Sequence, residues 1–199
     1  GPTSSTPVVG AIDPGIHGLE VVQTNINSKV YSFGTAGETV IFDGGGLSAN
    51  NNSPAIGDIT GDGQADIVSV DFEGRVLVHT LRSNFDFVDG YPKDLIGEVH
   101  YSPVLADVDG DGALDVLIVT TDGNSSELHV LDENGSEMNG YPVEFFSRIT
   151  ARPSVLENTS GQVESIFILT ANRNLVSLAP SGSAVWTTTL ADSSVCAPV

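Results

Sequence analysis

Apolar residues are grouped along this chain in short runs, each separated from the next by polar turn-forming residues. Between residues 102 and 145, the runs "SPVLADV", "DVLIVTT", "ELHVLD" and "GYPVEF" each have the length of a β-strand. Segments rich in Gly, Asn, Asp and Ser, such as "DGNSS", separate them and are typical of tight turns. No segment shows sustained apolar spacing at 3.6 residues, the period of a helix. The pattern therefore predicts short antiparallel strands and little helix.

The run that opens each unit recurs at a nearly constant spacing. "TPVVGAID", "SPAIGDIT", "SPVLADVD" and "RPSVLENT" align on Pro7, Pro54, Pro103 and Pro153, which lie 47, 49 and 50 residues apart. Four strand-length runs in each unit of about 50 residues are typical of a β-propeller blade. A β-sandwich would not explain the period. We therefore expect an all-β protein with four propeller blades, each made of four antiparallel strands.

The repeats also set the expected organisation of the chain. Residues 1–5 are expected to be a cloning remnant and linker, because Gly-Pro before a Ser/Thr-rich stretch resembles a protease-cleavage scar. The expected blades are residues 6–52, 53–101, 102–151 and 152–197, and residues 198–199 would start a fifth repeat. Four blades could form a small closed ring, half of a ring completed by a second copy, or part of a larger propeller. The trailing "APV" and the remnant favour the last of these.

A second repeated feature is a Tyr-Pro pair late in two of the units. The sequence "DGYP" ends at Pro92 and "NGYP" ends at Pro142, which places Tyr91 and Tyr141 fifty residues apart. Exposed aromatic rings that bind a ligand are one interpretation. Because the feature recurs with the repeat, we expect both rings to pack between blades.

Two loops crowd oxygen-bearing side chains at alternate positions. "DITGDGQAD" and "DVDGDGALD" each offer side-chain oxygens at positions 1, 3, 5 and 9 and a main-chain carbonyl at position 7, and their glycines permit a tight curl. An all-oxygen, carboxylate-rich shell suits Ca²⁺ better than Mg²⁺. We therefore predict two structural calcium sites. Their ligands are Asp58, Thr60, Asp62, Gln64 and Asp66 in one loop, and Asp107, Asp109, Asp111, Ala113 and Asp115 in the other.

Other interpretations of these loops are weaker. An EF-hand loop lies between two helices and has a glutamate at its position 12. Here position 12 is Ser69 or Ile118, and the segments on both sides of each loop have the pattern of strands. Asp-Gly turns alone would explain one loop, but not two loops in phase. The corresponding loops of the first and fourth units are not expected to bind calcium tightly, because each lacks several of these oxygen ligands. The first loop keeps only Asp13 and Glu20, and the fourth keeps Glu157, Thr159 and Ser165.

The charge balance limits the possible partners. With 26 acidic and 7 basic residues, the net charge is −19, which argues against nucleic acid and anionic membranes. No apolar run approaches the ~20 residues that span a bilayer, so direct membrane insertion is not expected. No catalytic spacing of histidine or serine is present. Cys196 has no internal disulfide partner, and four N-x-[ST] triplets, at Asn51, Asn124, Asn134 and Asn158, permit a secreted glycoprotein.

The D-x-D-G-D-G-x-x-D loops, which follow a Ser-Pro strand and precede an apolar one, resemble FG-GAP/VCBS repeats. Such repeats build calcium-binding β-propellers, including the headpiece of integrin α subunits. The resemblance implies an extracellular scaffold, secreted or at the cell surface, for adhesion or recognition of a protein or glycan. The FG and GAP signatures are missing around both loops, which is a departure from integrins.

The same resemblance allows a carbohydrate-binding module or part of a propeller polysaccharide lyase. A lyase needs a cluster of basic residues to hold an acidic polymer and stabilise an enolate. The seven basic residues are dispersed along the chain, at Lys29, Arg75, Arg82, Lys93, Arg148, Arg152 and Arg173. We therefore expect a protein that is not an enzyme.

Overall fold

Sixteen short strands make up the regular structure of the protein. The computed structural model describes residues 5–12, 18–24, 29–33, 39–43, 52–80 and 87–191, and these contain no helix, so none that could cross a membrane. Cys196 lies outside this part. The strands are β1 (Val8–Gly10), β2 (Glu20–Thr24), β3 (Lys29–Phe33), β4 (Thr39–Asp43), β5 (Ala55–Gly57), β6 (Asp66–Val70), β7 (Arg75–His79), β8 (Lys93–Asp94), β9 (Val104–Ala106), β10 (Asp115–Asp122), β11 (Ser125–Leu131), β12 (Val143–Phe145), β13 (Ser154–Glu157), β14 (Val163–Leu169), β15 (Asn174–Leu178) and β16 (Ala184–Thr189).

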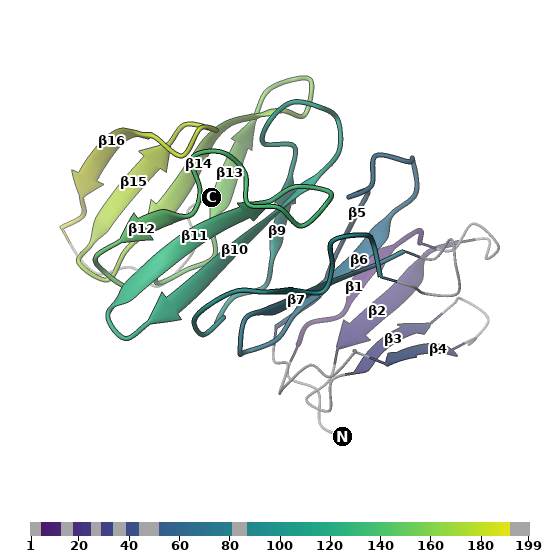
Figure 1. Cartoon of the computed structure of the whole chain (residues 1–199). Helices are drawn as coiled ribbons and strands as arrows, with labels where there is room; N and C mark the ends of the chain where they lie inside the picture. Colours follow the sequence, from purple (N-terminus) through teal and green to yellow (C-terminus); the bar gives the residue numbers. More distant parts are fainter. Residues whose placement is uncertain are drawn as a thin grey trace.

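The strands form four separate sheets that follow one another through the molecule (Figure 1). Each sheet has four antiparallel strands in chain order, from β1–β4 to β13–β16, and is called a blade below. This confirms the prediction of an all-β protein built from four-stranded propeller blades. The limits of each repeat in the sequence remain a prediction.

Burial on both faces explains the unbroken apolar run of β10. Val116 and Ile118 of the third blade belong to one buried cluster with Val68 of the second blade. Leu117, on the opposite side of the strand, belongs to another cluster with Ile166 of the fourth blade. Because successive side chains of a strand point to opposite faces, a strand between two blades must be apolar at every position. The blades are therefore held together by face-to-face apolar packing.

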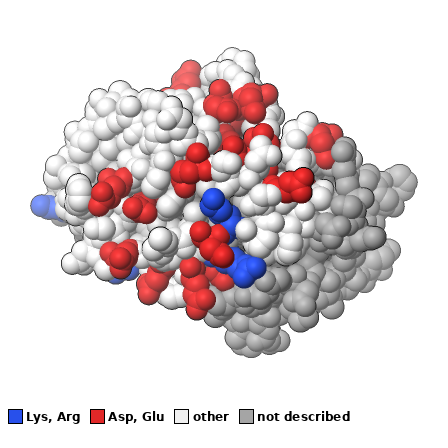
Figure 2. All heavy atoms as spheres, in the orientation of Figure 1, with Lys and Arg blue, Asp and Glu red and all other residues white. Residues whose placement is uncertain are grey.

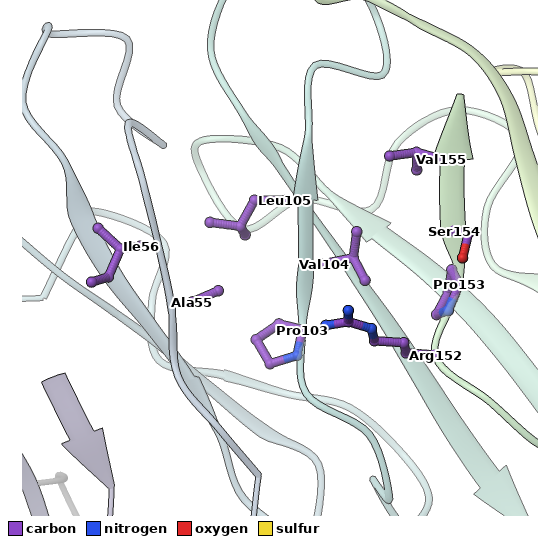
Figure 3. Close-up of a pocket in the computed structure, with 9 residues that line it drawn as sticks. All are labelled: Ala55, Ile56, Pro103, Val104, Leu105, Arg152, Pro153, Ser154 and Val155. Atoms are coloured by element: carbon purple, nitrogen blue, oxygen red, sulfur yellow. The ribbon is translucent and has the colours of Figure 1, made fainter. Parts of the chain in front are cut away.

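The innermost strands of three blades line a hollow of about 470 Å³ (Figure 3). Val104 and Leu105 of β9 point to opposite sides of their strand, toward β13 and β5 respectively. Main-chain hydrogen bonds join the loops after β5 and β9 to the next blade. Leu114 N donates to Asp58 O and Val163 N donates to Asp107 O, both at 3.0 Å. The two acidic loops are thus tied in sequence to neighbouring blades.

Tyr91 links the second blade to the third, and Tyr141 links the third blade to the fourth. Both rings are buried. The hydroxyl of Tyr91 donates to Asp132 O of the third blade at 3.0 Å, and that of Tyr141 donates to Pro180 O of the fourth blade at 2.9 Å. Burial raises the pKa of Tyr141 to about 12. The expectation that these repeated tyrosines pack between blades is confirmed.

Tyr141→Phe is expected to lower the free energy of unfolding by about 1–2 kcal/mol, because Pro180 O loses the donor that joins the two blades. Urea denaturation in the presence of calcium measures the change. Tyr101→Phe is the matched control, since its hydroxyl makes a longer, 3.3 Å bond to Ile149 O and is only partly buried. Equal losses in the two variants would contradict the special role of Tyr141.

Candidate metal centre

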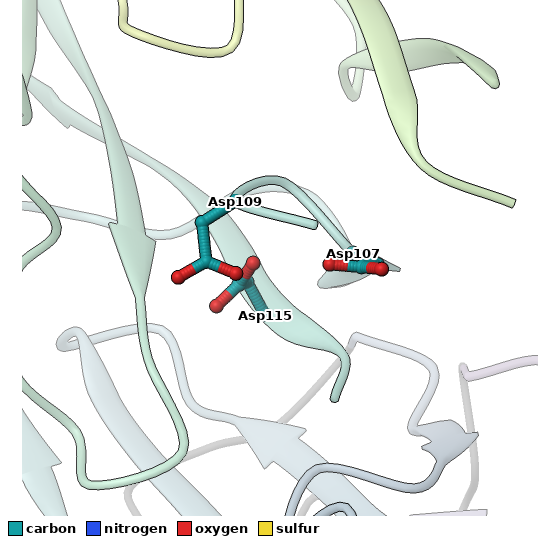
Figure 4. A group of neighbouring side chains, drawn as sticks. All are labelled: Asp107, Asp109 and Asp115. Atoms are coloured by element: carbon teal, nitrogen blue, oxygen red, sulfur yellow. The ribbon is translucent and has the colours of Figure 1, made fainter. Parts of the chain in front are cut away.

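The loop between β9 and β10 brings three carboxylates together. One oxygen from each of Asp107, Asp109 and Asp115 lies within 4.8 Å of the other two (Figure 4). Asp107 and Asp115 are buried, whereas Asp109 is exposed. Among the residues that the structure describes, this is the one such group of His, Cys, Asp or Glu ligands. It contains positions 1, 3 and 9 of the predicted ligand set.

Hydrogen bonds from main-chain amides hold the carboxylates in this loop. Asp107 Oδ1 accepts from Gly110 N at 2.7 Å, and Asp109 Oδ1 accepts from Asp111 N at 3.1 Å. Asp115 Oδ2 accepts from Val108 N at 2.8 Å, which ties the first residue of β10 to the start of the loop. All four glycines of the two acidic loops have positive φ, as the predicted curl requires.

The three carboxylates fit a hard cation. Calcium binds oxygen ligands at about 2.3–2.6 Å, so two ligands of one ion lie at most about 5 Å apart. The separations within the group satisfy this limit. Asp107, Asp109 and Asp115 would hold the ion, which would neutralise their mutual repulsion. Asp111 and Ala113 lie outside the group, and their role as ligands remains a prediction.

The electrostatics of Asp115 show how unfavourable the cluster is without a cation. The pKa of its carboxyl group is raised from 3.8 to about 7, chiefly by burial and also by the charges of Asp109, Asp111 and Asp107, against the opposing effect of the hydrogen bond from Val108 N. Without a cation this carboxyl group is thus only partly ionised at neutral pH, and a bound cation would favour its carboxylate form.

In calcium-free buffer, we expect the protein to lose stability as the pH rises from about 4 to about 7. The folded-state pKa of Asp115 is raised, so the folded protein binds more protons than the unfolded chain within this window. Stability is then fully present below the unfolded pKa and declines as Asp115 ionises. Urea denaturation across this range in EDTA measures the decline, which Asp115→Asn should reduce. An unchanged pH profile in that variant would contradict this assignment.

The loop of the second blade is arranged differently. Asp58 accepts from Asp62 N at 3.0 Å and from Gly63 N at 2.7 Å, so both its oxygens cap main-chain amides. Asp66 accepts from the Thr60 amide at 3.2 Å, and burial raises its pKa. The Thr60 hydroxyl is buried and has no hydrogen-bond partner within the described residues, which a cation would supply. A second calcium site here remains a prediction.

The loop of the fourth blade replaces carboxylates with amides. Asn158 Oδ1 accepts from Ser160 N at 2.8 Å and from Gln162 N at 3.1 Å, so this loop is closed by neutral groups. Gln162 Nε2 also donates to Gly110 O of the third-blade loop at 3.2 Å. Sequence reasoning missed this bridge, because only the stacking of the two blades brings the residues together. In the first blade, Asp13 lies outside the described residues.

Glu20 has the same position in the first blade as Asp66 and Asp115 have in theirs. It is fully buried, and its Oε2 accepts from Ile12 N at 2.8 Å. Asp115 accepts from Val108 N in the same way. The acid at position 9 therefore has a structural role in closing the loop, whether or not a metal binds there.

Comparisons with known proteins agree with this architecture. Residues 58–118, which include both acidic loops and the start of β10, match the family described as FG-GAP-like repeat. No curated protein matches the sequence. BamB from Moraxella catarrhalis has a TM-score of 0.62 at 15% identity, covering 92% of this chain and 51% of its own.

Two further solved structures are similar. BBS1N in complex with ARL6DN has a TM-score of 0.58 at 11% identity, covering 86% of this chain and 49% of its own. The C-terminal domain of Pseudomonas aeruginosa PilY1 has a TM-score of 0.58 at 14% identity, covering 81% and 39%. This chain thus spans about half the length of these proteins or less, and identities this low show similarity of fold alone. The protein is an all-β chain of propeller-type blades, and its residues 58–118 match the FG-GAP-like repeat model.

Proposed function

We propose that this chain is a calcium-stabilised, non-enzymatic scaffold that recognises a protein partner outside the cell. The observation that carries the proposal is the carboxylate group of Asp107, Asp109 and Asp115 within the FG-GAP-like segment. Calcium sites with dissociation constants of roughly 10⁻⁴–10⁻³ M suit extracellular modules, where calcium is abundant. A secreted or cell-surface location follows from that requirement.

Two neighbouring grooves beside the acidic loops are the proposed partner surface. One, of about 390 Å³, is lined by residues of the second and third blades, and the other, of about 580 Å³, by residues of the third and fourth. Glu133 lines both. We call them the rim grooves. Their charged lining residues are all acidic: Asp62, Asp89, Asp109, Asp111, Asp132, Glu133 and Glu137.

The charge of the rim grooves indicates the chemistry of the partner. Figure 2 shows acidic side chains spread over the visible face and few basic ones. A surface of one sign attracts partners of the opposite sign and repels those of its own. The grooves therefore favour a protein with a basic segment over an acidic polysaccharide, although a glycan ligand is the alternative that the experiment must include. Adhesion through this surface is the cellular role we propose.

A binding screen against purified extracellular proteins and glycans, in calcium at about 1 mM or in EDTA, tests this function. We expect a basic protein to bind in calcium and to bind more weakly as salt is added. Glu133→Lys should weaken that binding, and the matched charge reversal Glu164→Lys, at an exposed site outside the grooves, should not. Turnover of a polysaccharide without protein binding would overturn the proposal.

A further inference from the structure

Within the part of the chain that the structure describes, the first and last blades each have one face against which no other blade packs. Figure 1 shows these two blades at opposite ends of the row. We call the face directed toward a preceding blade the leading face, and the face directed toward a following blade the trailing face. On the leading face of the first blade, Val9 is 59% exposed and Phe33 is 38% exposed. On the trailing face of the last, Leu156 is 48% exposed and Trp186 is 44% exposed.

The strand register shows that the exposed residues of the first blade form an apolar row, and that Phe167 and Trp186 of the fourth blade lie in a row that also contains Ser154 and Ser177. Val9 pairs with Val21, which pairs with Phe33, so the three lie side by side across β1, β2 and β3. In the fourth blade, Ser177 pairs with both Phe167 and Trp186. The rings of Phe167 and Trp186 meet across it, with their centroids 6.0 Å apart.

The corresponding leading rows inside the molecule are buried. In the second blade the row is Ile56, Ile67 and His79, and Ile67 packs with Val22 of the first blade. In the third blade the row is Leu105, Val116 and Leu131, which belongs to the cluster shared with the second blade. The row of Val9, Val21 and Phe33 therefore has the same register position as rows that are packed against another blade inside the molecule.

The corresponding trailing rows are buried as well. In the third blade, Leu117 pairs with Val104 and Val130, and Leu117 is 0% exposed because the fourth blade covers it. In the fourth blade, Phe167 occupies the register position of Leu117. At each of the three internal interfaces, a trailing row packs against the leading row of the next blade. The leading row of the first blade and the trailing row of the fourth blade lie outside these three interfaces.

We infer that the trailing face of one copy packs against the leading face of a second copy, and the reverse, so that two copies close a ring of eight blades. The contact continues an interface that the chain already makes three times. This chain covers 51% of BamB and 49% of BBS1N, so two copies match the size of either propeller chain. Neither exposed row contains a charged residue, whereas each copy has a net charge of −19. Added salt should therefore strengthen the association by screening the repulsion. This inference does not depend on the proposed function.

Sedimentation velocity of the chain in calcium, over a series of protein concentrations, tests the inference. We expect a dimer whose dissociation constant falls as salt is added. Trp186→Glu on the trailing face and Val9→Glu on the leading face should each weaken the dimer about tenfold or more. Thr187→Glu is the control, since Thr187 is exposed on the opposite face of the same strand, where it pairs with Val176. Circular dichroism confirms that each variant is folded.

Mixing the two face variants distinguishes head-to-tail packing from a symmetric dimer. The Val9→Glu chain keeps its trailing face and the Trp186→Glu chain keeps its leading face, so the mixture should form a heterodimer through one intact interface. Each variant alone should be monomeric at the same concentration. A wild-type chain that remains monomeric, a dimer insensitive to Trp186→Glu, or a mixture that forms no heterodimer would each overturn the inference.

Discussion

Removing calcium with EDTA should lower the melting temperature of the protein by roughly 5–10 °C. A ligand that binds only the folded state at a hundredfold excess over its dissociation constant, as calcium at about 10 mM does for a constant of about 10⁻⁴ M, adds about 2.7 kcal/mol to the free energy of unfolding. For a chain of this length, each kcal/mol shifts the melting temperature by about 2–4 °C. The stabilisation arises because the cation offsets the repulsion among Asp107, Asp109 and Asp115, whose oxygens lie within 4.8 Å of one another. Thermal unfolding followed by circular dichroism, with and without EDTA, measures the shift.

Variants of the acidic loop identify which carboxylates contribute to this shift. Asp115→Asn should abolish most of it, and Asp109→Asn should reduce it more than Asp111→Asn, because Asp111 lies outside the group. Asp122→Asn is the matched control, since Asp122 is exposed at the far end of β10. A melting curve that EDTA leaves unchanged would show that the protein has no stabilising calcium site.

Gly140→Ala should be among the most damaging single substitutions in this protein. A Cβ atom at Gly140 would lie 2.2 Å from Ser181 O, a main-chain atom of the next blade that cannot move alone. The φ angle of Gly140 is also +97°, where an L-residue costs about 1–2 kcal/mol. Overpacking of this kind adds about 1–3 kcal/mol. We therefore expect a total loss of about 2–5 kcal/mol in urea denaturation.

The control for Gly140 separates backbone strain from the steric contact. Gly123 also has positive φ, at +58°, but a Cβ atom there would meet nothing within 4 Å. Gly123→Ala should therefore lose only the backbone contribution. Gly90→Ala tests the same contact one repeat earlier, since its Cβ atom would lie 1.8 Å from Asn134 O. Equal losses at Gly123 and Gly140 would show that the close approach of the blades has no energetic importance.

Much of the fold was predictable because each repeat unit shows the same local sequence patterns. The spacing of Pro54 and Pro103, the turn residues and the strand-length runs each depend on nearby residues only. The apolar run of β10 was predicted to be a strand, and the burial of Val116 and Leu117 on its two faces is the structural reason for its unbroken apolar character. The repetition of Tyr91 at Tyr141 predicted packing between blades, although not that each hydroxyl would reach a carbonyl of the next blade.

The candidate metal centre was only partly predictable. Spacing identified every residue of the group formed by Asp107, Asp109 and Asp115, but it did not separate them from Asp111, because the direction of each side chain depends on how the loop curls. The bridge from Gln162 to Gly110 O joins residues fifty-two positions apart, and it depends on how two blades stack. Alternating patterns specify which face of a strand is apolar, but not which partner covers it.

The sequence by itself determined the period, the strands, the two acidic loops and the excess of acidic over basic residues, since each follows from residue types at short range. Only the tertiary structure decided which carboxylates meet, which glycines touch the neighbouring blade and which apolar rows remain uncovered. These features depend on the distance and orientation between blades, which are set by the packing of many side chains together. The row of Val9, Val21 and Phe33 is the clearest case, because it is apolar like the buried row of Leu105, Val116 and Leu131 and only its position in the molecule differs.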